Sequence, residues 1–167
     1  MAFTIKQATS EDAATVATLN TDVQQLHADA LPRVYKQPDS AATTRVFAEW
    51  FAQPDITCFI AYADGDPAGY ILLRAVRREE NPFMYARDSL YIDQMSVAAA
   101  YRGTGCAHLL MEEARALARA TGVRELGLDV LAFNERAHRF YEKEGFYAYR
   151  TVMTAEVGEA HRDRPDR

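Results

Sequence analysis

Apolar residues in the first fifty positions recur with two different spacings. Phe3 and Ile5 alternate with polar neighbours, which predicts a strand over Phe3–Gln7. Ser10 is then placed to cap a helix, and four apolar residues follow at three- and four-residue steps: Val16, Leu19, Val23 and Leu26. This stripe predicts a first helix that ends near His27. A second helix, over residues 41–51, is expected to bury three side chains: Val46, Phe47 and Trp50.

The middle and C-terminal parts of the chain alternate between strand and helix patterns. β-Branched and aromatic residues predict a strand over Ile56–Ala63, residues 64–67 spell the turn Asp-Gly-Asp-Pro, and a return strand is expected over residues 69–76. The charged residues 77–82 are expected to form a solvated loop. Further strands are predicted over residues 89–97, 126–131 and 146–157, and helices over residues 105–120 and 134–144. This order predicts the α/β (α+β) class, with a mixed, mostly antiparallel sheet and helices on both faces.

Length and composition limit the class of protein. The 167 residues are 49% hydrophobic and 26% charged, which is typical of one globular domain, expected over residues 1–158. Residues 159–167 are charged, have nothing apolar to bury and are predicted to be disordered. No apolar run reaches the roughly 18–20 residues of a membrane span, and the N-terminus lacks the pattern of a secretory signal. We therefore expect a cytoplasmic protein that does not bind membranes.

Charge and cysteine content exclude further classes. The 24 acidic and 19 basic residues give a formal net charge of −5, which argues against nucleic acid as a partner. Cys58 and Cys106 stand far apart and form neither a metal-ligand spacing nor a disulfide framework. We therefore expect no metal site, and a reducing compartment.

Residues 97–107 join a predicted strand to a predicted helix through a glycine-rich turn that contains Gly103 and Gly105. Glycines let a ligand approach the backbone closely, and the first N–H groups of the helix favour an anion such as a pyrophosphate. Arg102 adds a forked cation. A dinucleotide fingerprint requires a third glycine where His108 stands, and a Walker loop requires Gly-Lys-Ser/Thr. A glycine-rich helix start without any ligand stays open as the alternative.

Two motifs follow one another along the chain. Residues 102–107 read Arg-Gly-Thr-Gly-Cys-Ala, and Val97 stands five residues before them. Residues 134–146 contain Asn134, Ala137, Tyr141 and a closing Gly-Phe. Together they resemble the GNAT superfamily of N-acetyltransferases, whose signatures are Arg/Gln-x-x-Gly-x-Gly/Ala and Asn-x-x-Ala-x-x-x-Tyr. The order of elements over residues 3–157 also agrees with that fold.

The resemblance implies that acetyl-coenzyme A is the co-substrate. In GNAT enzymes the glycine turn holds its pyrophosphate, and the pantetheine arm lies between two central parallel strands that splay apart, here residues 90–97 and 126–131. The Met95 N–H is then placed to donate to the thioester oxygen as negative charge develops there. The implied coenzyme-binding residues are Met95, Ser96, Val97, Arg102, Gly103, Thr104, Gly105, Cys106, Ala107 and Asn134.

Tyr141 is the catalytic acid that the resemblance implies. In the family, the tyrosine at this motif position protonates the leaving coenzyme A thiolate. A phenol with a pKa of about 10 stays protonated at neutral pH and can donate that proton. Asn134 lies two helical turns earlier, on the same face of the predicted helix. A core aromatic residue beside Phe140 is the alternative interpretation of Tyr141.

Acetyl transfer also requires a neutral amine, and an amine with a pKa of about 10.4 is charged at pH 7. Asp93 is the first candidate to take its proton or to anchor a cationic acceptor, with a solvent-facing strand residue as the alternative. Tyr91 shares its face and is expected to line the acceptor site. His27 is a second candidate for the acceptor side, with capping or packing as the alternative.

Direct attack of an amine on the thioester is the expected mechanism. Cys106 and His108 are two residues apart, so they point to different sides of a helix and form no nucleophile pair. The leading hypothesis is an acetyl-coenzyme A-dependent N-acetyltransferase that acts on a primary amine of a small molecule, peptide or protein. The alternative is a non-catalytic acyl-coenzyme A-binding sensor of the same fold. The resemblance also implies a homodimer that pairs through the closing strand, and the composition selects no acceptor.

Overall fold

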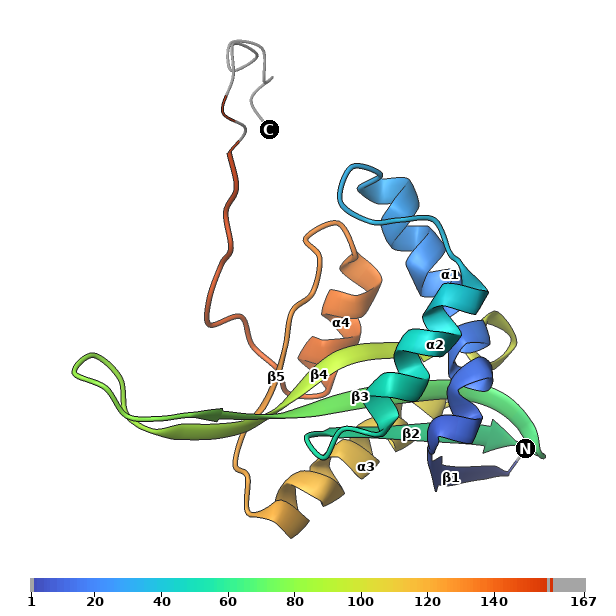
Figure 1. Cartoon of the computed structure of the whole chain (residues 1–167), viewed down its shortest axis with the longest axis horizontal. Coiled ribbons are helices and arrows are strands. Elements are labelled where there is room, and N and C mark those ends of the chain that lie inside the picture. The colour runs from blue at the N-terminus through green and yellow to red at the C-terminus, as the bar shows by residue number, and fades with distance from the viewer. Residues whose placement is uncertain (1, 156, 158–167) are drawn as a thin grey trace. The chain divides into compact units, whose positions relative to one another are not determined.

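The computed structural model describes residues 2–155 and 157 and falls into two compact units. The first unit comprises residues 1–134 and contains the sheet with helices α1, α2 and α3; the second comprises residues 135–167 and contains α4 (Glu135–Lys143) (Figure 1). The predicted tail over residues 159–167 lies outside the described residues.

The first unit is built on a five-stranded sheet with the order β1-β2-β3-β4-β5. The strands are β1 (Phe3–Gln7), β2 (Ile56–Ala63), β3 (Asp66–Arg78), β4 (Arg87–Val97) and β5 (Leu126–Leu128). The first four pair antiparallel, and β5 joins β4 in parallel at the end of the sheet. The other elements are α1 (Ala13–Ala30), α2 (Ser40–Phe51), α3 (Cys106–Thr121) and the 3₁₀ turns η1 (Ser10–Asp12) and η2 (Ala99–Tyr101). The mixed, mostly antiparallel sheet confirms the predicted fold class.

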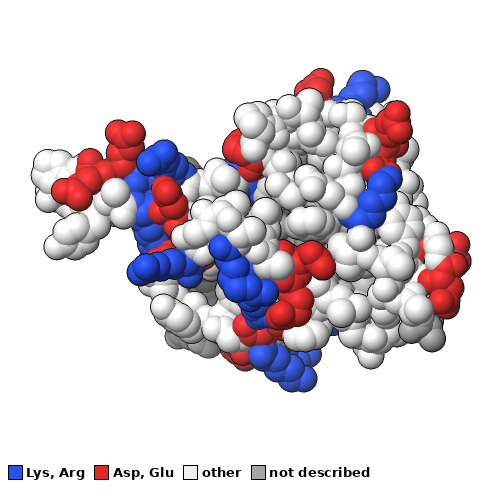
Figure 2. Space-filling view, turned by 90° about the horizontal axis from the view of Figure 1, so that it is seen from below, with Lys and Arg blue, Asp and Glu red and all other residues white. Residues whose placement is uncertain are grey.

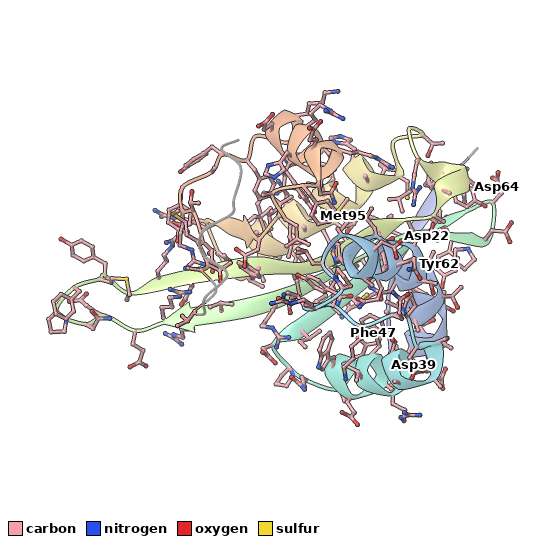
Figure 3. The ribbon with its side chains drawn as sticks, turned by 90° about the horizontal axis from the view of Figure 1, so that it is seen from above. Asp22, Asp39, Phe47, Tyr62, Asp64 and Met95 are labelled. Carbon is pink, nitrogen blue, oxygen red and sulfur yellow. The ribbon has the colours of Figure 1, made fainter. Side chains whose placement is uncertain are left out.

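Helices α1 and α2 cover one face of the sheet. Phe47 of α2 is buried there, and its ring contacts the rings of Trp50, Phe51 and Tyr70. Apolar residues of α1 and β2 complete this core: Val16, Leu19, Ile56, Cys58 and Ile60. In Figure 3, α1 and α2 lie on one side of the strands, with Phe47 between them and the sheet.

Helix α3 covers the opposite face. Side chains alternate across a strand, so Ile71 and Leu73 of β3 point away from the α1–α2 core. Helix α3 packs against β2, β3 and β4 and buries Leu110, Met111 and Ala114. The predicted placement of helices on both faces is therefore confirmed.

The first helix is capped differently from the prediction. Asp12, not Ser10, is the N-cap of α1, and Thr9 caps the preceding 3₁₀ turn η1, where it forms a capping box with Asp12. The Asp12 carboxylate accepts hydrogen bonds from the Thr9 N–H at 2.8 Å and from the Thr9 hydroxyl at 3.1 Å. Ser10 is displaced into the short 3₁₀ turn η1 because its hydroxyl donates to the carbonyl of Ala48 instead.

Two predicted core residues are exposed. Val46 is 40% exposed because the buried side of α2 is centred on Phe47, and adjacent residues on a helix point about 100° apart. Leu26 is also exposed, because the buried side of the last turns of α1 is centred on Ala28, and residues two positions apart on a helix point about 200° apart.

The hairpin between β3 and β4 is longer than predicted. Arg77 and Arg78 were expected in a loop, but β3 continues to Arg78, where it pairs with Arg87 of β4. The side chain of Asn81 closes the hairpin by accepting hydrogen bonds from the N–H groups of Phe83 and Met84. Strand β5 is shorter than predicted and ends at Leu128.

The strand expected over residues 146–157 does not form in the described residues. A strand requires a neighbouring strand, and within residues 135–155 the second unit provides only the helix α4. Phe146 is half-buried against Tyr141, whereas Tyr147, Val152 and Met153 are exposed.

Opposite charges stand next to one another on the hairpin. Arg77 lies 3.8 Å from Asp88, and Arg87 is paired with Glu125 beside β5. Figure 2 shows the same mixture, with Lys and Arg side chains gathered next to Asp and Glu side chains on that face. Local pairing of this kind balances the charge of the hairpin.

Candidate functional site

A β-bulge interrupts the pairing of β3 with β4. Leu72 pairs with Gln94 and Leu73 with Ile92, so Asp93 has no residue opposite it in β3. Such an extra residue shifts the register of everything that follows it in the strand.

The bulge changes which backbone groups of β4 face away from β3. Before it, the Leu90 N–H donates to Glu125 O at 3.0 Å, on the β5 side. After it, the Ala98 N–H donates to Ala68 O at 2.9 Å, on the β3 side. N–H groups alternate along a strand, so those of Leu90 and Ala98 would face the same side in a regular strand. They face opposite sides because the bulge shifts the register between them. Counting back from Ala98, the N–H groups of Met95 and Val97 point away from β3.

Strand β5 ends where these groups begin. The parallel ladder pairs Leu90 with Leu126 and stops at Ile92 with Leu128, while β4 continues to Val97. The outward N–H groups of Met95 and Val97 therefore face a side from which β5 has diverged, and a backbone donor requires a partner. Ser96, also expected to contact the coenzyme, is buried and turns its N–H toward β3.

The glycine turn presents further backbone donors. Gly103 and Gly105 have φ angles of +78° and +92°, in the left-handed region that favours glycine, and Gly105 is the cap of α3. The first hydrogen bond of α3 runs from the Leu109 N–H to Gly105 O at 3.1 Å. The N–H groups of Cys106 and Ala107 precede it and have no acceptor within the helix. With the helix dipole behind them, they favour an anion.

Arg102 is fixed at the entrance to this turn. Its Nε donates to Val97 O at 3.1 Å and its Nη2 to Asp22 Oδ2 of α1 at 3.1 Å (Asp22 is labelled in Figure 3). The Thr104 hydroxyl donates to Tyr101 O at 2.6 Å and steadies the turn. The Val97 carbonyl is thus engaged by Arg102, and its N–H is the group left to bind a ligand.

Asp93 lies in an ion-pair cluster that the sequence did not reveal. Arg74 Nε donates to Asp93 Oδ2 at 2.8 Å, and Arg74 Nη1 lies 3.5 Å from Asp55 Oδ2. The guanidinium also stacks over the ring of Trp50, 5.9 Å from its centroid. The Asp93 side chain is only 21% exposed, so it is a paired, partly buried carboxylate rather than a solvent-facing one. Tyr91, half-buried, pairs with Arg74 in the same ladder.

His27 belongs to an aromatic cluster. Its ring lies 5.0 Å from that of Tyr35, in the connection after α1, and 6.4 Å from that of Phe133, in the segment after β5. Burial lowers the pKa of His27, so the imidazole is neutral at pH 7. The His27 ring therefore packs among aromatic side chains, and its contact with an acceptor stays a prediction.

Both cysteines are free and buried. Burial raises the pKa of the Cys58 thiol to about 12 and that of the Cys106 thiol to about 11. A nucleophilic cysteine requires a lowered pKa, so Cys106 is not activated by the start of α3. What Cys106 offers a ligand is its backbone N–H.

In the second unit, the ring of Tyr141 contacts those of Phe140 at 5.3 Å and Phe146 at 5.7 Å. The Phe146 N–H donates to Tyr141 O at 2.9 Å after the end of α4. Burial raises the pKa of the Tyr141 phenol to about 12, so it stays protonated well above neutral pH. In the first unit, Asn134 immediately precedes α4.

The described residues contain neither a membrane-spanning helix nor a metal-binding group of side chains. No helix within residues 2–155 is long and apolar enough to cross a membrane. Within the same part of the chain, no three His, Cys, Asp or Glu side chains are grouped so that they could hold a metal ion.

Comparisons with known proteins agree on one family. The model of the acetyltransferase (GNAT) family matches residues 17–146, a range that includes parts of both units. Uncharacterized N-acetyltransferases from Mycobacterium bovis and Mycobacterium tuberculosis are 32% identical over 108 residues, which cover 65% of this chain and 64% of each relative. The match therefore spans less than two thirds of the length of these curated relatives.

Solved structures show the same architecture. A tetramutant of the BH1408 protein from Bacillus halodurans has a TM-score of 0.86 and 26% identity, covering 92% of this chain and 99% of that one. The aminoglycoside N-acetyltransferase AAC(6')-Iy in complex with CoA has a TM-score of 0.74 and 17% identity, covering 94% and 96%. At 17% identity the likeness shows the fold alone.

Proposed function

Because the chain belongs to the acetyltransferase (GNAT) family, we propose that it transfers the acetyl group of acetyl-coenzyme A to a primary amine. The observation that carries the proposal is the row of outward N–H groups at Met95 and Val97, followed by the N–H groups at the start of α3. An amide-bearing arm that ends in a pyrophosphate suits such a row of donors. When bound, acetyl-coenzyme A supplies the acetyl group as a reactive thioester.

Each outward group has a proposed task. The Met95 N–H donates to the acyl oxygen as negative charge develops on it. The Val97 N–H binds the pantetheine arm, and Asn134 lies on the coenzyme side. The pyrophosphate is held by Arg102 and by the backbone of the turn and of the start of α3: Gly103, Thr104, Gly105, Cys106 and Ala107.

Tyr141 is the proposed general acid. Its phenol stays protonated because burial raises its pKa to about 12, which is above the value of about 8.5 for a thiol in water. A thiolate that leaves in a desolvated site has a raised pKa as well, so the proton can pass from the Tyr141 hydroxyl to it. The same desolvation makes the phenol a strong hydrogen-bond donor to the developing negative charge.

The acceptor amine is proposed to approach the bulge from the α1–α2 face. Asp93 lies on that face, where it pairs with Arg74, and it is the carboxylate nearest to the Met95 N–H along the strand. We assign it the task of orienting the ammonium group of the acceptor and guiding its proton to water. Tyr91 and His27 are proposed to contact the acceptor.

The test is turnover of acetyl-coenzyme A with a panel of amines: a polyamine, an aminoglycoside, a free amino acid and a peptide N-terminus. Release of coenzyme A is followed with a thiol reagent, since the protein's own two thiols are buried. The aminoglycoside is included because one structurally similar protein is an aminoglycoside N-acetyltransferase. Binding of acetyl-coenzyme A without acetylation of any amine would favour the alternative, a non-catalytic sensor of acyl-coenzyme A.

The variant Tyr141→Phe tests the general acid. We expect kcat to fall by about 10²–10⁴-fold with the KM for acetyl-coenzyme A nearly unchanged, because the lost group acts on the leaving thiolate. Tyr147→Phe is the matched control, since that side chain is 84% exposed, and it should keep the wild-type rate. An unchanged kcat in Tyr141→Phe refutes the role of Tyr141 and leaves the acetyltransferase activity standing.

We also propose a homodimer in a reducing, cytoplasmic setting. Large apolar side chains are exposed in both units, among them Phe83 and Tyr85 on the hairpin and Tyr147 and Met153 after α4. Burial of such residues against a second copy of the chain is favourable, because it removes apolar surface from water. Light scattering at micromolar concentration measures the mass directly, and a monomer contradicts this proposal.

A further inference from the structure

A buried polar triad connects α1, β3 and β4. The Tyr70 hydroxyl donates to Gln94 Oε1 at 2.8 Å and accepts from Asn20 Nδ2 at 2.8 Å. Asn20 Nδ2 also lies 3.2 Å from Gln94 Oε1. Tyr70 is fully buried and Asn20 is 7% exposed. Polar groups at such depth are destabilising unless they bond one another, so each member depends on the other two.

The triad lies immediately beside the bulge. Gln94 follows Asp93 in the chain, and both side chains contact residues on the α1–α2 face of the sheet: Gln94 contacts Tyr70, and Asp93 contacts Arg74. In a regular strand, two consecutive side chains would point to opposite faces. The two polar contacts can therefore form together only in the bulged register.

The register in turn decides where the N–H groups of β4 point. If the bulge were lost, every residue after it would shift by one position, and the Met95 N–H would turn toward β3. The contacts made by Gln94 thus bear on the direction of a backbone donor one residue further along the strand.

We propose that Asn20, Tyr70 and Gln94 are positioning residues that hold the bulge in β4 and so keep the Met95 N–H turned toward the reacting acyl group. The proposal rests on the proposed acetyl transfer. The triad touches neither the coenzyme nor the amine; it acts through the backbone of β4. Weakening it lowers the fraction of molecules in the bulged register, which reduces kcat more than it affects capture of the pyrophosphate at α3.

Tyr70→Phe removes one hydroxyl and leaves the ring in its place against Phe47. We expect kcat to fall by at least about tenfold, since loss of an oxyanion donor costs about 10²–10³-fold. The KM for acetyl-coenzyme A should change by less than about threefold. Gln94→Met removes the acceptor at similar length and should reproduce this pattern. Tyr62→Phe, the same change on β2 (Tyr62 is labelled in Figure 3), is the control and should behave as wild type.

Amide hydrogen exchange tests the direction of the Met95 N–H without requiring turnover, because it measures which amides the bound coenzyme protects. In the wild type, adding acetyl-coenzyme A should protect the amides of Met95 and Ala107. In Tyr70→Phe and Gln94→Met, protection at Met95 should weaken while that at Ala107 remains. A role limited to stability would instead lower protection throughout the sheet.

The outcomes separate the two proposals. Wild-type kcat and wild-type protection of Met95 in both folded variants overturn the role of the triad, whatever amine is the acceptor. If acetyl-coenzyme A protects neither Met95 nor Ala107 in the wild type, the coenzyme site itself is refuted, and the triad's role is refuted with it. Equal losses of protection at the two amides would also overturn it, since the variants would then act on the whole fold.

Discussion

Replacement of Gly105 by alanine tests the glycine turn with a single methyl group. Gly105 has a φ of +92°, and a Cβ built on it would meet no atom of the protein within 4 Å. The substitution therefore introduces no steric clash, and its effect on stability comes from the backbone conformation alone. An L residue in the left-handed region costs about 1–2 kcal/mol.

Gly65 provides a matched control for this strain. It has a φ of +97°, its Cβ would also meet nothing within 4 Å, and it stands in the turn between β2 and β3. For a chain of this size, about 1–2 kcal/mol lowers the Tm by roughly 2–8 °C, and we expect this fall in both variants. Thermal unfolding followed by circular dichroism measures it.

Only the substitution at Gly105 should weaken binding of acetyl-coenzyme A. If the backbone relaxes to a negative φ, the N–H groups of Cys106 and Ala107 rotate away from the direction in which they are proposed to bind the pyrophosphate. Losing one charge-assisted hydrogen bond to a phosphate costs about 1.5–3 kcal/mol, which corresponds to a rise in the Kd of acetyl-coenzyme A of roughly 10–100-fold. Isothermal titration measures the Kd, and Gly65→Ala should bind as the wild type does.

The comparison can fail in two distinguishable ways. If Gly105→Ala and Gly65→Ala lose the same stability and bind acetyl-coenzyme A equally well, the turn does not hold the pyrophosphate. If only one of them loses stability, the assumption that strain alone sets the cost is wrong. In either case the result bears on the turn and leaves the bulge in β4 untouched.

Two further variants test groups on either side of the sheet. Arg102→Gln should raise the Kd of acetyl-coenzyme A about 2–30-fold, because a cation–phosphate bond worth about 1.5–3 kcal/mol is lost, while loss of the exposed ion pair with Asp22 offsets about 1 kcal/mol of this. Arg77→Gln on the hairpin is the control. Burial lowers the pKa of His27 below its value of about 6.5 in the unfolded chain, so the unfolded state takes up the proton first, and the free energy of unfolding should fall as the pH drops below about 6.5. Urea titrations between about pH 7 and pH 5 should show a smaller fall in His27→Gln, and an equal fall contradicts the assignment to His27.

Features that depend on short stretches of sequence were predictable. The glycine turn is one, because Gly103 and Gly105 require their positive φ angles locally and the helix start follows from them. The apolar stripe of α1 predicted the helix but placed Leu26 on its buried side. Leu26 is exposed and Ala28 is buried, because a stripe of large apolar residues does not show where the packing moves onto a small residue. The closing strand failed for a similar reason: alternation indicates a strand but does not supply its partner.

The bulge in β4 and its polar contacts could not be predicted from the sequence. Asn20 and Tyr70 are fifty residues apart, and nothing near either residue indicates that they bond. The available signals were Arg74, which stands among apolar residues in the sequence Ile-Leu-Leu-Arg-Ala-Val, and the adjacent residues Asp93 and Gln94, since a polar residue in a buried strand requires a partner. The partners of Asp93 and Gln94 are determined by the register of β3 against β4, which the sequence does not show.

The two halves of the candidate site differ in the same way: one depends on neighbouring residues in the sequence, the other on contacts between distant residues. The coenzyme half, at the start of α3, is determined by a few consecutive residues, so changes there should alter binding and leave the rest of the fold intact. The reacting half, around Met95, is determined by contacts among α1, β3 and β4, because the direction of one N–H follows from the register of the whole strand. If acetyl transfer occurs here, substitutions in the turn should act on the Kd and KM of the coenzyme, and those beside the bulge on kcat. If substitutions in the turn and substitutions beside the bulge instead changed the same kinetic constant, the candidate site would not be divided into a binding half and a reacting half. The bulge would then be a structural feature of the sheet alone.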